Sequence, residues 1–404
     1  MKKSKVGVYT AVVTLALALG ACSSTESDTD KSDSGEIAFW DPYPQYEDGS
    51  DWDDHVKACA PDGKDIVRSS APQTDLFNQL TTGVKEGTAP DVALLDNPMM
   101  PEAAEAGLLT DLDEVGLSAE GIDENLLGPG IVDGKTYGVP VGSNALALFY
   151  NKEILDDAGV DPEQISDWAS LNSALEQVSD GGDTAITFAG VAGEEGVFQF
   201  LPWFWGSGAD LSAPGSEGAV EAAQMLSDWI ANGWAPKSAT TDNQSNAWDL
   251  FLTGEVGFVE NGSWFAADAE GAPFEVGVLP IPAKDDAVAP VPTGGEFFIV
   301  PPQESEDYSG AKEVIECLIH GDAALTTSET LGYLSAVQGV RDEQVAENEL
   351  WEPWVGSVEG ARGRTTDLGA DYVNTSGDVS SALQTALNAN GDEAAVREAF
   401  ESME

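Results

Sequence analysis

The chain has 404 residues, and its 17 basic and 72 acidic side chains give a formal net charge of −55 at pH 7. Such a negative field repels nucleic acid and anionic lipid headgroups, which excludes both as binding partners. Hydrophobic residues make up 42% of the sequence, which excludes a wholly disordered chain. The length exceeds what one hydrophobic core covers, so two domains are expected, in a monomer.

The N-terminus predicts a lipoprotein signal peptide over residues 1–21. Lysines precede an apolar run at residues 6–19 that is too short for a spanning helix. The run ends in Leu-Gly-Ala-Cys, which resembles the lipobox of bacterial lipoproteins and implies acylation of Cys22. An ordinary signal peptide with a chance cysteine is the alternative. Residues 22–35 lack large apolar side chains and are expected to be a flexible tether at the extracellular face of the membrane.

Strands and helices alternate along the next part of the chain. In order, the patterns predict a strand at 37–40, a short helix at 52–60, a strand at 65–68, a helix at 75–85, a strand at 90–95 and a short helix at 101–108. The continuous apolar run PDVALL is typical of a strand that is buried on both faces.

The alternation continues to the C-terminus. The second half is expected to contain strands at 145–150, 185–188 and 256–260, followed or separated by helices at 216–232, 311–320, 379–388 and 392–403. The helix at 216–232 is apolar along one side and ends at Gly233. This pattern predicts an α/β protein with mainly parallel sheets.

Few residues suit catalysis or metal binding. His55 and His320 are the only histidines, and both lie in predicted helical segments, so a catalytic triad or a histidine-rich zinc site is poorly supplied. No glycine-rich phosphate loop with Lys-Ser/Thr is present, and the acidic cluster at residues 48–54 lacks calcium-loop spacing. No cofactor or metal is expected. Paired carboxylates for glycoside cleavage stay open, because so many acids guarantee close pairs.

Beyond residue 22 only two cysteines remain, Cys59 and Cys317. Both fall on the apolar faces of predicted helices. A pair in an exported protein indicates one disulfide. Two buried free thiols are the alternative, since free cysteine is a common core residue.

Several segments, in order along nearly the whole chain, resemble the extracellular solute-binding proteins related to maltose-binding protein. The segments are IAFWDPY, LTTGVKEGTAPDVALLDNP, EAAEAGLLTDLDE, GKTYGVPVGSNALALFYNKEILDDAGVD, FLTGEVGFVENGSWF and PTGGEFFIVPP. The fourth is the best match, because it resembles the family's YG-x-P crossing followed by L-x-YNK-x-x-L-x-x-AG. The sequence departs from the family pattern mainly at residues 47–64.

The resemblance implies a periplasmic-binding-protein-like fold: two α/β lobes joined by hinge crossing strands, with ligand held in an interlobe cleft. The first lobe is expected at 36–140 plus 290–338, and the second at 141–289 plus 339–404. Both cysteine-bearing helices then fall in the first lobe, which favours their disulfide. Hinge closure around the ligand is the motion of this class. The implied function is capture of a carbohydrate for the membrane permease of an ABC importer, without enzymatic turnover.

A sugar ring needs flat aromatic faces for its C–H surfaces and planar polar groups for its hydroxyls. The chain has 11 Trp, an ample supply. The aromatic candidates for the ligand site are Trp40, Tyr43, Phe198, Trp203, Trp264 and Tyr372. Trp264 follows a glycine turn and lies on no periodic core face, which favours the cleft. Of Trp203 and Trp205, one is expected in the cleft and the other in the core.

Polar candidates follow predicted strands or open the crossing segments. They are Asp41, Asp96, Asn97, Asn144, Glu194, Gly294, Gly295, Glu296 and Arg364. Arg364 and Tyr372 are placed in one loop before the last helices, and Glu194 in a glycine-rich loop. The alternative for each acidic candidate is a solvated charge on the surface. The alternative for Arg364 is a surface position where it balances nearby acidic residues.

Two other functions remain open from the sequence. One is a secreted carbohydrate-active enzyme, which turnover of the sugar would distinguish from a binding protein. The other keeps the fold and binds a different solute, such as a phosphate ester, a metal complex or a polyamine. An acidic cleft would suit a polyamine, whereas the tryptophans and the YNK segment favour a sugar.

Overall fold

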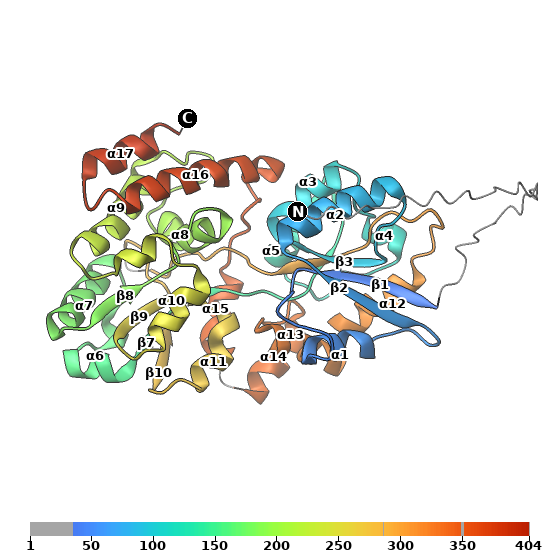
Figure 1. The fold of residues 1–404 in the computed structure, drawn as a ribbon, viewed down its shortest axis with the longest axis horizontal. Coiled ribbons are helices and arrows are strands. Elements are labelled where there is room, and N and C mark those ends of the chain that lie inside the picture. The colour runs from blue at the N-terminus through green and yellow to red at the C-terminus, as the bar shows by residue number, and fades with distance from the viewer. Residues whose placement is uncertain (1–34, 286, 349–350, 404) are drawn as a thin grey trace, which may run out of the picture. The chain divides into compact units, whose positions relative to one another are not determined.

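The computed structural model describes residues 35–285, 287–348 and 351–403. The expected signal peptide, Cys22 and the tether up to residue 34 lie outside the described residues. Within the described part, no helix is long and apolar enough to cross a membrane. Residues from Gly35 to the C-terminus form one compact unit that contains two open sheets, each covered by helices (Figure 1).

The first sheet has five strands in the order β2-β1-β3-β11-β6. The strands are β1 (Glu36–Asp41), β2 (Asp65–Ser70), β3 (Val92–Asp96), β6 (Val139–Pro140) and β11 (Glu296–Ile299). Alternate residues of β3 enter two different cores. Val92 and Leu94 join the core of α1 (Asp51–Ala58) and α12 (Ser309–Ile319), whereas Ala93 and Leu95 join that of α2 (Gln73–Glu86) and α3 (Met100–Glu105). The period of two along a strand buried on both faces explains the continuous apolar run.

The second sheet has four strands in the order β10-β7-β9-β8. They are β7 (Leu146–Asn151), β8 (Thr184–Thr187), β9 (Val256–Gly262) and β10 (Val276–Leu279). Every residue of β9 is buried. The covering helices include α6 (Lys152–Ala158), α7 (Trp168–Gly181), α8 (Glu194–Gly206), α9 (Glu217–Ala231), α10 (Gln244–Phe251) and α16 (Tyr372–Leu387). Together they bury one large hydrophobic core on this sheet.

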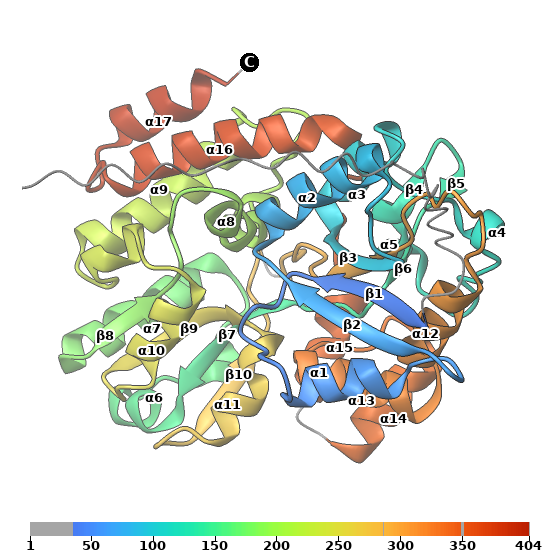
Figure 2. The same ribbon diagram turned by 45° about the vertical axis from the view of Figure 1, so that its right-hand side comes forward.

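The other elements are short or peripheral. They are the helices α4 (Leu112–Val115), α5 (Glu124–Leu127), α11 (Ala266–Glu270), α13 (Gly321–Leu331), α14 (Gln338–Glu347), α15 (Glu352–Glu359) and α17 (Glu393–Glu401), and the hairpin of β4 (Ile131–Val132) with β5 (Lys135–Thr136). In both views α17 lies beside α16 (Figure 2).

The prediction of mainly parallel sheets is wrong, because both sheets are mixed. In the first, β1 runs parallel to β2 and β3, but β11 is antiparallel to β3 and to β6. In the second, β9 is parallel to β8, but β7 is antiparallel to both of its neighbours. The reversal in the first sheet arises because the chain leaves after β6, builds the second sheet, and re-enters through β11.

Helix α16 begins at Tyr372, seven residues before the predicted start at 379. The segment YVNTSGD contains residues of low helix propensity, which concealed the first turns from a sequence pattern. Packing of α16 against α8 and α9 overrides that preference. Tyr372 and Glu194 are therefore helix residues rather than loop residues, since Glu194 is the first residue of α8.

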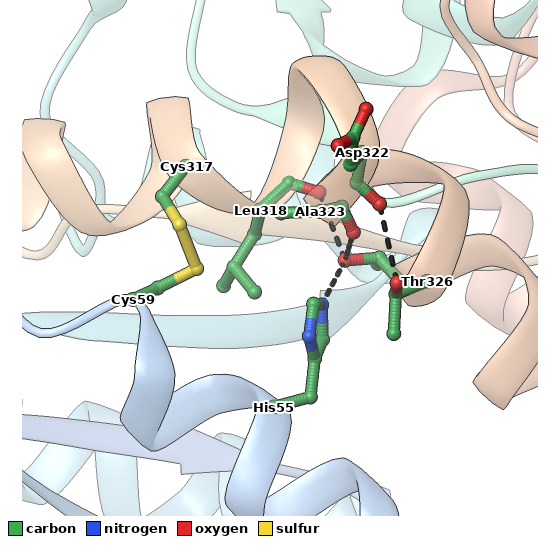
Figure 3. Close-up of a disulfide and its surroundings, with 8 residues drawn as sticks. His55, Cys59, Cys317, Leu318, Asp322, Ala323 and Thr326 are labelled. Carbon is green, nitrogen blue, oxygen red and sulfur yellow. Dashed lines mark hydrogen bonds between the residues drawn. A yellow bond between two sulfur atoms is a disulfide. The ribbon is translucent and has the colours of Figure 1, made fainter.

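A disulfide joins Cys59, the residue that ends α1, to Cys317 in α12, as expected (Figure 3). The Cα atoms are 5.7 Å apart and the bond closes a sequence separation of 258 residues. Nearby, His55 Nε2 lies 2.8 Å from Thr327 Oγ1 of α13. Burial lowers the His55 pKa. The bond therefore ties the first helix of this unit to the segment that follows β11.

Candidate functional site

A cavity of about 970 Å3 lies where the strand ends of both sheets meet the following loops. Its lining residues are Tyr43, Gln45, Tyr46, Asp96, Asn144, Glu194, Glu195, Phe198, Gln244, Ser245, Trp264, Phe265, Ala267, Asp268, Gly294, Gly295, Glu296, Glu329, Thr330, Leu331, Gly332, Tyr333 and Arg364. Ligands of open α/β sheets bind outside the carboxyl ends of the strands, where Asp96 is the last residue of β3. A second cavity, of about 480 Å3, lies on α7, α9 and α17 and contains none of the predicted site residues.

The cavity brings together ten of the fifteen residues that the sequence nominated. They are Tyr43, Asp96, Asn144, Glu194, Phe198, Trp264, Gly294, Gly295, Glu296 and Arg364. They come from segments that are distant along the chain and converge only in the fold. The structure places these residues together; their contacts with a ligand stay a prediction.

Two nominated aromatic residues lie in the hydrophobic cores instead. Trp203 is fully buried, donates its Nε1 hydrogen to Glu260 Oε2 at 2.8 Å, and packs edge-on against Trp229. Trp205 is also buried, so the expectation that one of this pair lines the cleft is wrong. Trp40 packs against the core of α2 and α3. Helix α8 is apolar on nearly every side, which is why its face toward the cavity could not be read from periodicity.

Three nominated polar residues support the cavity without lining it. Asp41 is buried and accepts hydrogen bonds from Arg68 and from the Trp52 indole. Asn97 donates to the backbone oxygen of Thr293 at 2.8 Å. Tyr372, also buried, donates its hydroxyl hydrogen to Glu194 Oε1 at 2.7 Å. Tyr372 therefore holds Glu194, a residue of the cavity lining, whereas Asp41 and Asn97 fix segments next to the lining.

Arg364 joins the two sides of the cavity. It is 3% exposed, and its Nη2 lies 2.9 Å from Asp96 Oδ1, at the end of β3. Its Nη1 lies 2.7 Å from Glu194 Oε1, at the start of α8, and its guanidinium lies over the Phe198 ring at 5.0 Å. Burial raises the Asp96 pKa, although the Arg364 charge counteracts that rise. The planar fork of arginine suits this double contact.

Glu296 forms a second polar cluster at the floor of the cavity. The Tyr43 and Tyr333 hydroxyls both donate to its Oε2, the latter at 2.8 Å. Glu296 also faces Asp96 across the paired strands β11 and β3. Burial, and then the Asp96 charge, raise the Glu296 pKa to about 7. A carboxyl group this desolvated binds a proton readily near neutral pH.

Trp264 and Phe198 form an aromatic wall. Their ring centroids are 6.2 Å apart, with the planes inclined by 45°. Trp264 is half-buried on the short 3-10 helix that follows β9 (Ser263–Phe265). Gly332 makes this placement possible, because a Cβ there would lie 2.6 Å from Trp264 Cα. A flat face that is open on one side suits stacking against a ring.

Asn144 presents an acceptor without a partner. The residue is 7% exposed, and its Oδ1 is buried with no hydrogen-bond partner among the described residues. A Cβ at Gly294 would lie 1.6 Å from that Oδ1, so only glycine leaves room for the amide. An unpaired buried acceptor costs free energy until a donor meets it.

Sequence reasoning missed several lining residues. They are Gln45, Tyr46, Gln244, Ser245, Phe265, Ala267, Asp268, Glu329, Thr330, Leu331, Gly332 and Tyr333. Most lie in loops or at helix ends with no motif of their own. No sequence pattern identified Tyr333, which in the structure follows Gly332, a residue with a φ of 67° at the turn after α13. Within the described residues, no group of three or more His, Cys, Asp and Glu is placed to hold a metal ion.

Comparisons with known proteins agree with this architecture. The model of a family described as bacterial extracellular solute-binding protein matches residues 60–353. A binding protein of Brucella abortus (strain 2308) is 25% identical over 359 residues, covering 83% of this chain and 81% of its own. The maltodextrin-binding protein MdxE of Bacillus subtilis (strain 168) is 26% identical over 301 residues, covering 70% and 67%. Maltose-bound MalE3 of T. maritima shares the fold, with a TM-score of 0.78, 21% identity and coverage of 91% and 98%.

Proposed function

The chain belongs to the bacterial extracellular solute-binding protein family, and from this premise we propose that it captures a di- or oligosaccharide and delivers it to the permease of an ABC importer. The observation that carries the proposal is the lining of the larger cavity. An aromatic wall at Trp264 and Phe198 lines the same cavity as hydrogen-bonding groups such as Asn144 and Glu296. This combination matches the apolar faces and hydroxyl rim of a sugar.

The proposed lobes are 36–140 plus 290–338 and 141–289 plus 339–404. The strand assignments support this division, because every strand of the five-stranded sheet falls in the first set and every strand of the four-stranded sheet in the second. The lobes are proposed to close over the sugar by a hinge motion. The permease would then distinguish the closed form from the open one.

We propose that the protein is a monomer held at the extracellular face of the membrane by lipid on Cys22. The basic start, the short apolar run and the Leu-Gly-Ala-Cys ending support this proposal. A lipoprotein cysteine bears at least two acyl chains, which anchor stably where one would not.

The protein is proposed to bind its sugar without turnover. Membership of a solute-binding family supports this, although Asp96 and Glu296 do place two carboxyl groups beside the same cavity. Chromatography of the sugar after long incubation tests it. Recovery of intact sugar is expected, and hydrolysis products that vanish in Glu296→Gln would identify an enzyme.

The acidic lining favours one second candidate, a polyamine or similar cationic solute. The lining contains Asp96, Glu194, Glu195, Asp268, Glu296 and Glu329, against Arg364 as its one base. The same excess of acid disfavours a phosphate ester, because like charges repel.

A thermal-shift screen of the purified chain against sugars and polyamines separates these functions. A ligand that binds only the folded state raises the melting temperature by mass action. A shift with a di- or oligosaccharide and none with spermidine is expected. The reverse pattern would replace the sugar with a polyamine.

A further inference from the structure

The lining of the larger cavity carries more acidic than basic side chains, and a neutral sugar does not compensate this excess of negative charge. Arg364 is the one base among its lining residues, and its guanidinium is already shared by Asp96 and Glu194. Glu296 receives only the two tyrosine hydroxyls at its Oε2, and no described residue donates to its Oε1. Among the described residues, the Glu296 carboxyl group forms no ion pair with a base, and it lies beside another acid, Asp96, whose effect the Arg364 charge offsets only in part.

The hydrogen-bonding groups are unbalanced in the same direction. The buried Oδ1 of Asn144 is an acceptor that lacks a donor among the described residues. Tyr43 and Tyr333 already donate their hydroxyl hydrogens to Glu296. A ligand that brings hydrogen-bond donors therefore suits this part of the lining, and a positively charged donor is the one that a desolvated carboxylate binds most strongly.

The aromatic wall narrows the choice of cation. Trp264 and Phe198 provide ring faces on the same cavity, which the C–H face of a sugar ring covers and an extended polyamine chain covers poorly. The site thus combines a surface for stacking with an uncompensated acidic floor.

We propose that the preferred ligand is a carbohydrate bearing a protonated amine, and that Glu296, supported by Asp96, is the acceptor of its ammonium group. This inference rests on the proposed carbohydrate function and specifies the substrate class of the same cavity. The raised Glu296 pKa supports it, because an ammonium group at the floor stabilises the ionised carboxylate that burial and Asp96 disfavour.

The test compares matched sugars on the purified full-length chain by calorimetric titration. The probes are D-glucosamine against D-glucose, D-galactosamine against D-galactose, a β-1,4-linked glucosamine tetramer against cellotetraose, and spermidine. At least one amino sugar is expected to bind about tenfold or more tightly than its hydroxyl counterpart. The buffer is held at about pH 7, where sugar amines are largely protonated and the Glu296 carboxyl group, with a pKa of about 7, is ionised in part before the ligand binds.

Two variants locate the effect. Glu296→Gln keeps the shape of the side chain and is expected to reduce the ratio of amino-sugar to neutral-sugar affinity to about threefold or less. Glu270→Gln removes one carboxylate from exposed α11, outside the cavity lining, and is expected to keep the ratio. The wild-type ratio decides the proposal by itself if Glu296→Gln folds poorly.

The possible outcomes distinguish a failure of the amine preference from a failure of the proposed carbohydrate-binding function. Neutral sugars binding as tightly as their amino counterparts would overturn the amine preference and leave the carbohydrate function standing. A preference that survives in well-folded Glu296→Gln would remove the ammonium from Glu296. Binding of spermidine without any sugar, or no binding at all, would overturn both proposals.

Discussion

Glycines beside the cavity decide where its larger side chains can lie. Gly294 leaves the space that the Asn144 amide occupies, and Gly332 allows the backbone of Trp264 to come close. Gly332 also has a φ of 67°, a conformation that other residues rarely adopt. Replacing either glycine would displace a neighbouring residue of the proposed ligand site.

Trp264→Ala is expected to weaken sugar binding by at least about tenfold, which corresponds to about 1.4 kcal/mol. The indole supplies the stacking face, and its removal from a half-buried site leaves the hydrophobic core intact. Calorimetric titration measures the effect, with circular dichroism to verify folding. Trp234→Ala is the control, because Trp234 is a half-buried tryptophan that lines the second cavity instead. Full affinity in folded Trp264→Ala would exclude the residue from the site.

Glu260 is expected to make stability depend on pH. It is buried in β9 with Trp203 as its hydrogen-bond donor, and burial raises its pKa to about 8 from the ordinary 4.5. Between these values the folded chain binds the proton more often than the unfolded chain does. Protonation of Glu260 therefore contributes to the free energy of unfolding at acidic pH. This contribution falls by about 1.4 kcal/mol for each pH unit between the two pKa values, as pH rises toward 8.

Glu260→Gln removes the titration and keeps an acceptor for Trp203. Denaturant unfolding at several pH values from 5 to about 8 is expected to show a smaller loss of stability in this variant than in the wild type. Glu255→Gln, at an exposed residue just before the same strand, is expected to keep the wild-type slope. Equal slopes in Glu260→Gln and the wild type would contradict the role of the buried carboxyl.

The sequence allowed prediction of residues that follow a strand or a glycine turn, such as Asp96 and Trp264, both of which line the cavity. It misplaced Trp203, because α8 is apolar on nearly every side and no period distinguishes its faces. Tyr333 was missed because its position depends on which loops the fold brings together, a property that local patterns do not carry.

Among the elements, the six predicted strands lie close to observed strands, but β10 and the hairpin of β4 and β5 were not predicted, and neither were the antiparallel strand directions. The runs at 145–150 and 256–260 correspond to β7 and β9, because apolar continuity marks a buried strand. Whether such a strand runs parallel or antiparallel depends on where the chain re-enters the sheet. The antiparallel strand β11 follows β10 and a long connection. Its direction depends on the path of the whole chain, so the local sequence did not predict it.

Loss of the disulfide between α1 and α12 is expected to cost roughly 2–5 kcal/mol of the free energy of unfolding, because the bond closes a long loop and restricts the unfolded chain. The measurement is denaturant unfolding of Cys59→Ala/Cys317→Ala beside the wild type. Intact-mass analysis after thiol alkylation checks the bond itself. Two alkylated thiols in the unreduced exported protein would show that the bond does not form.

At the scale of the whole molecule, the site belongs to neither sheet alone. Asp96 ends a strand of the first sheet, Trp264 follows a strand of the second, and Arg364 comes from a later loop. A sequence pattern predicts each segment separately, whereas their convergence was accessible only through resemblance to a family with this fold. The resemblance therefore supplied the cleft, and the residues supplied its chemistry.

Cys22→Ala is expected to release the protein from the membrane into the medium or to block its processing, because the proposed lipid attaches at that thiol. Fractionation of cells that express the wild type and the variant, followed by immunodetection, measures the distribution. Ser23→Ala changes the adjacent residue and serves as the control, which should stay with the membrane. Unchanged retention of Cys22→Ala would end the lipoprotein proposal.

Because Arg364 is buried, its ion pairs depend less on ionic strength than exposed ion pairs do. Dissolved ions shorten the reach of electrostatic forces to about 3 Å at 1 M ionic strength, which weakens exposed pairs such as Lys135 with Asp111. The contacts of Arg364 with Asp96 and Glu194 are enclosed by protein on the arginine side, so counterions reach them poorly. Added salt screens the repulsion between the many acidic residues of the surface. It weakens the ion pairs of Arg364 with Asp96 and Glu194 much less.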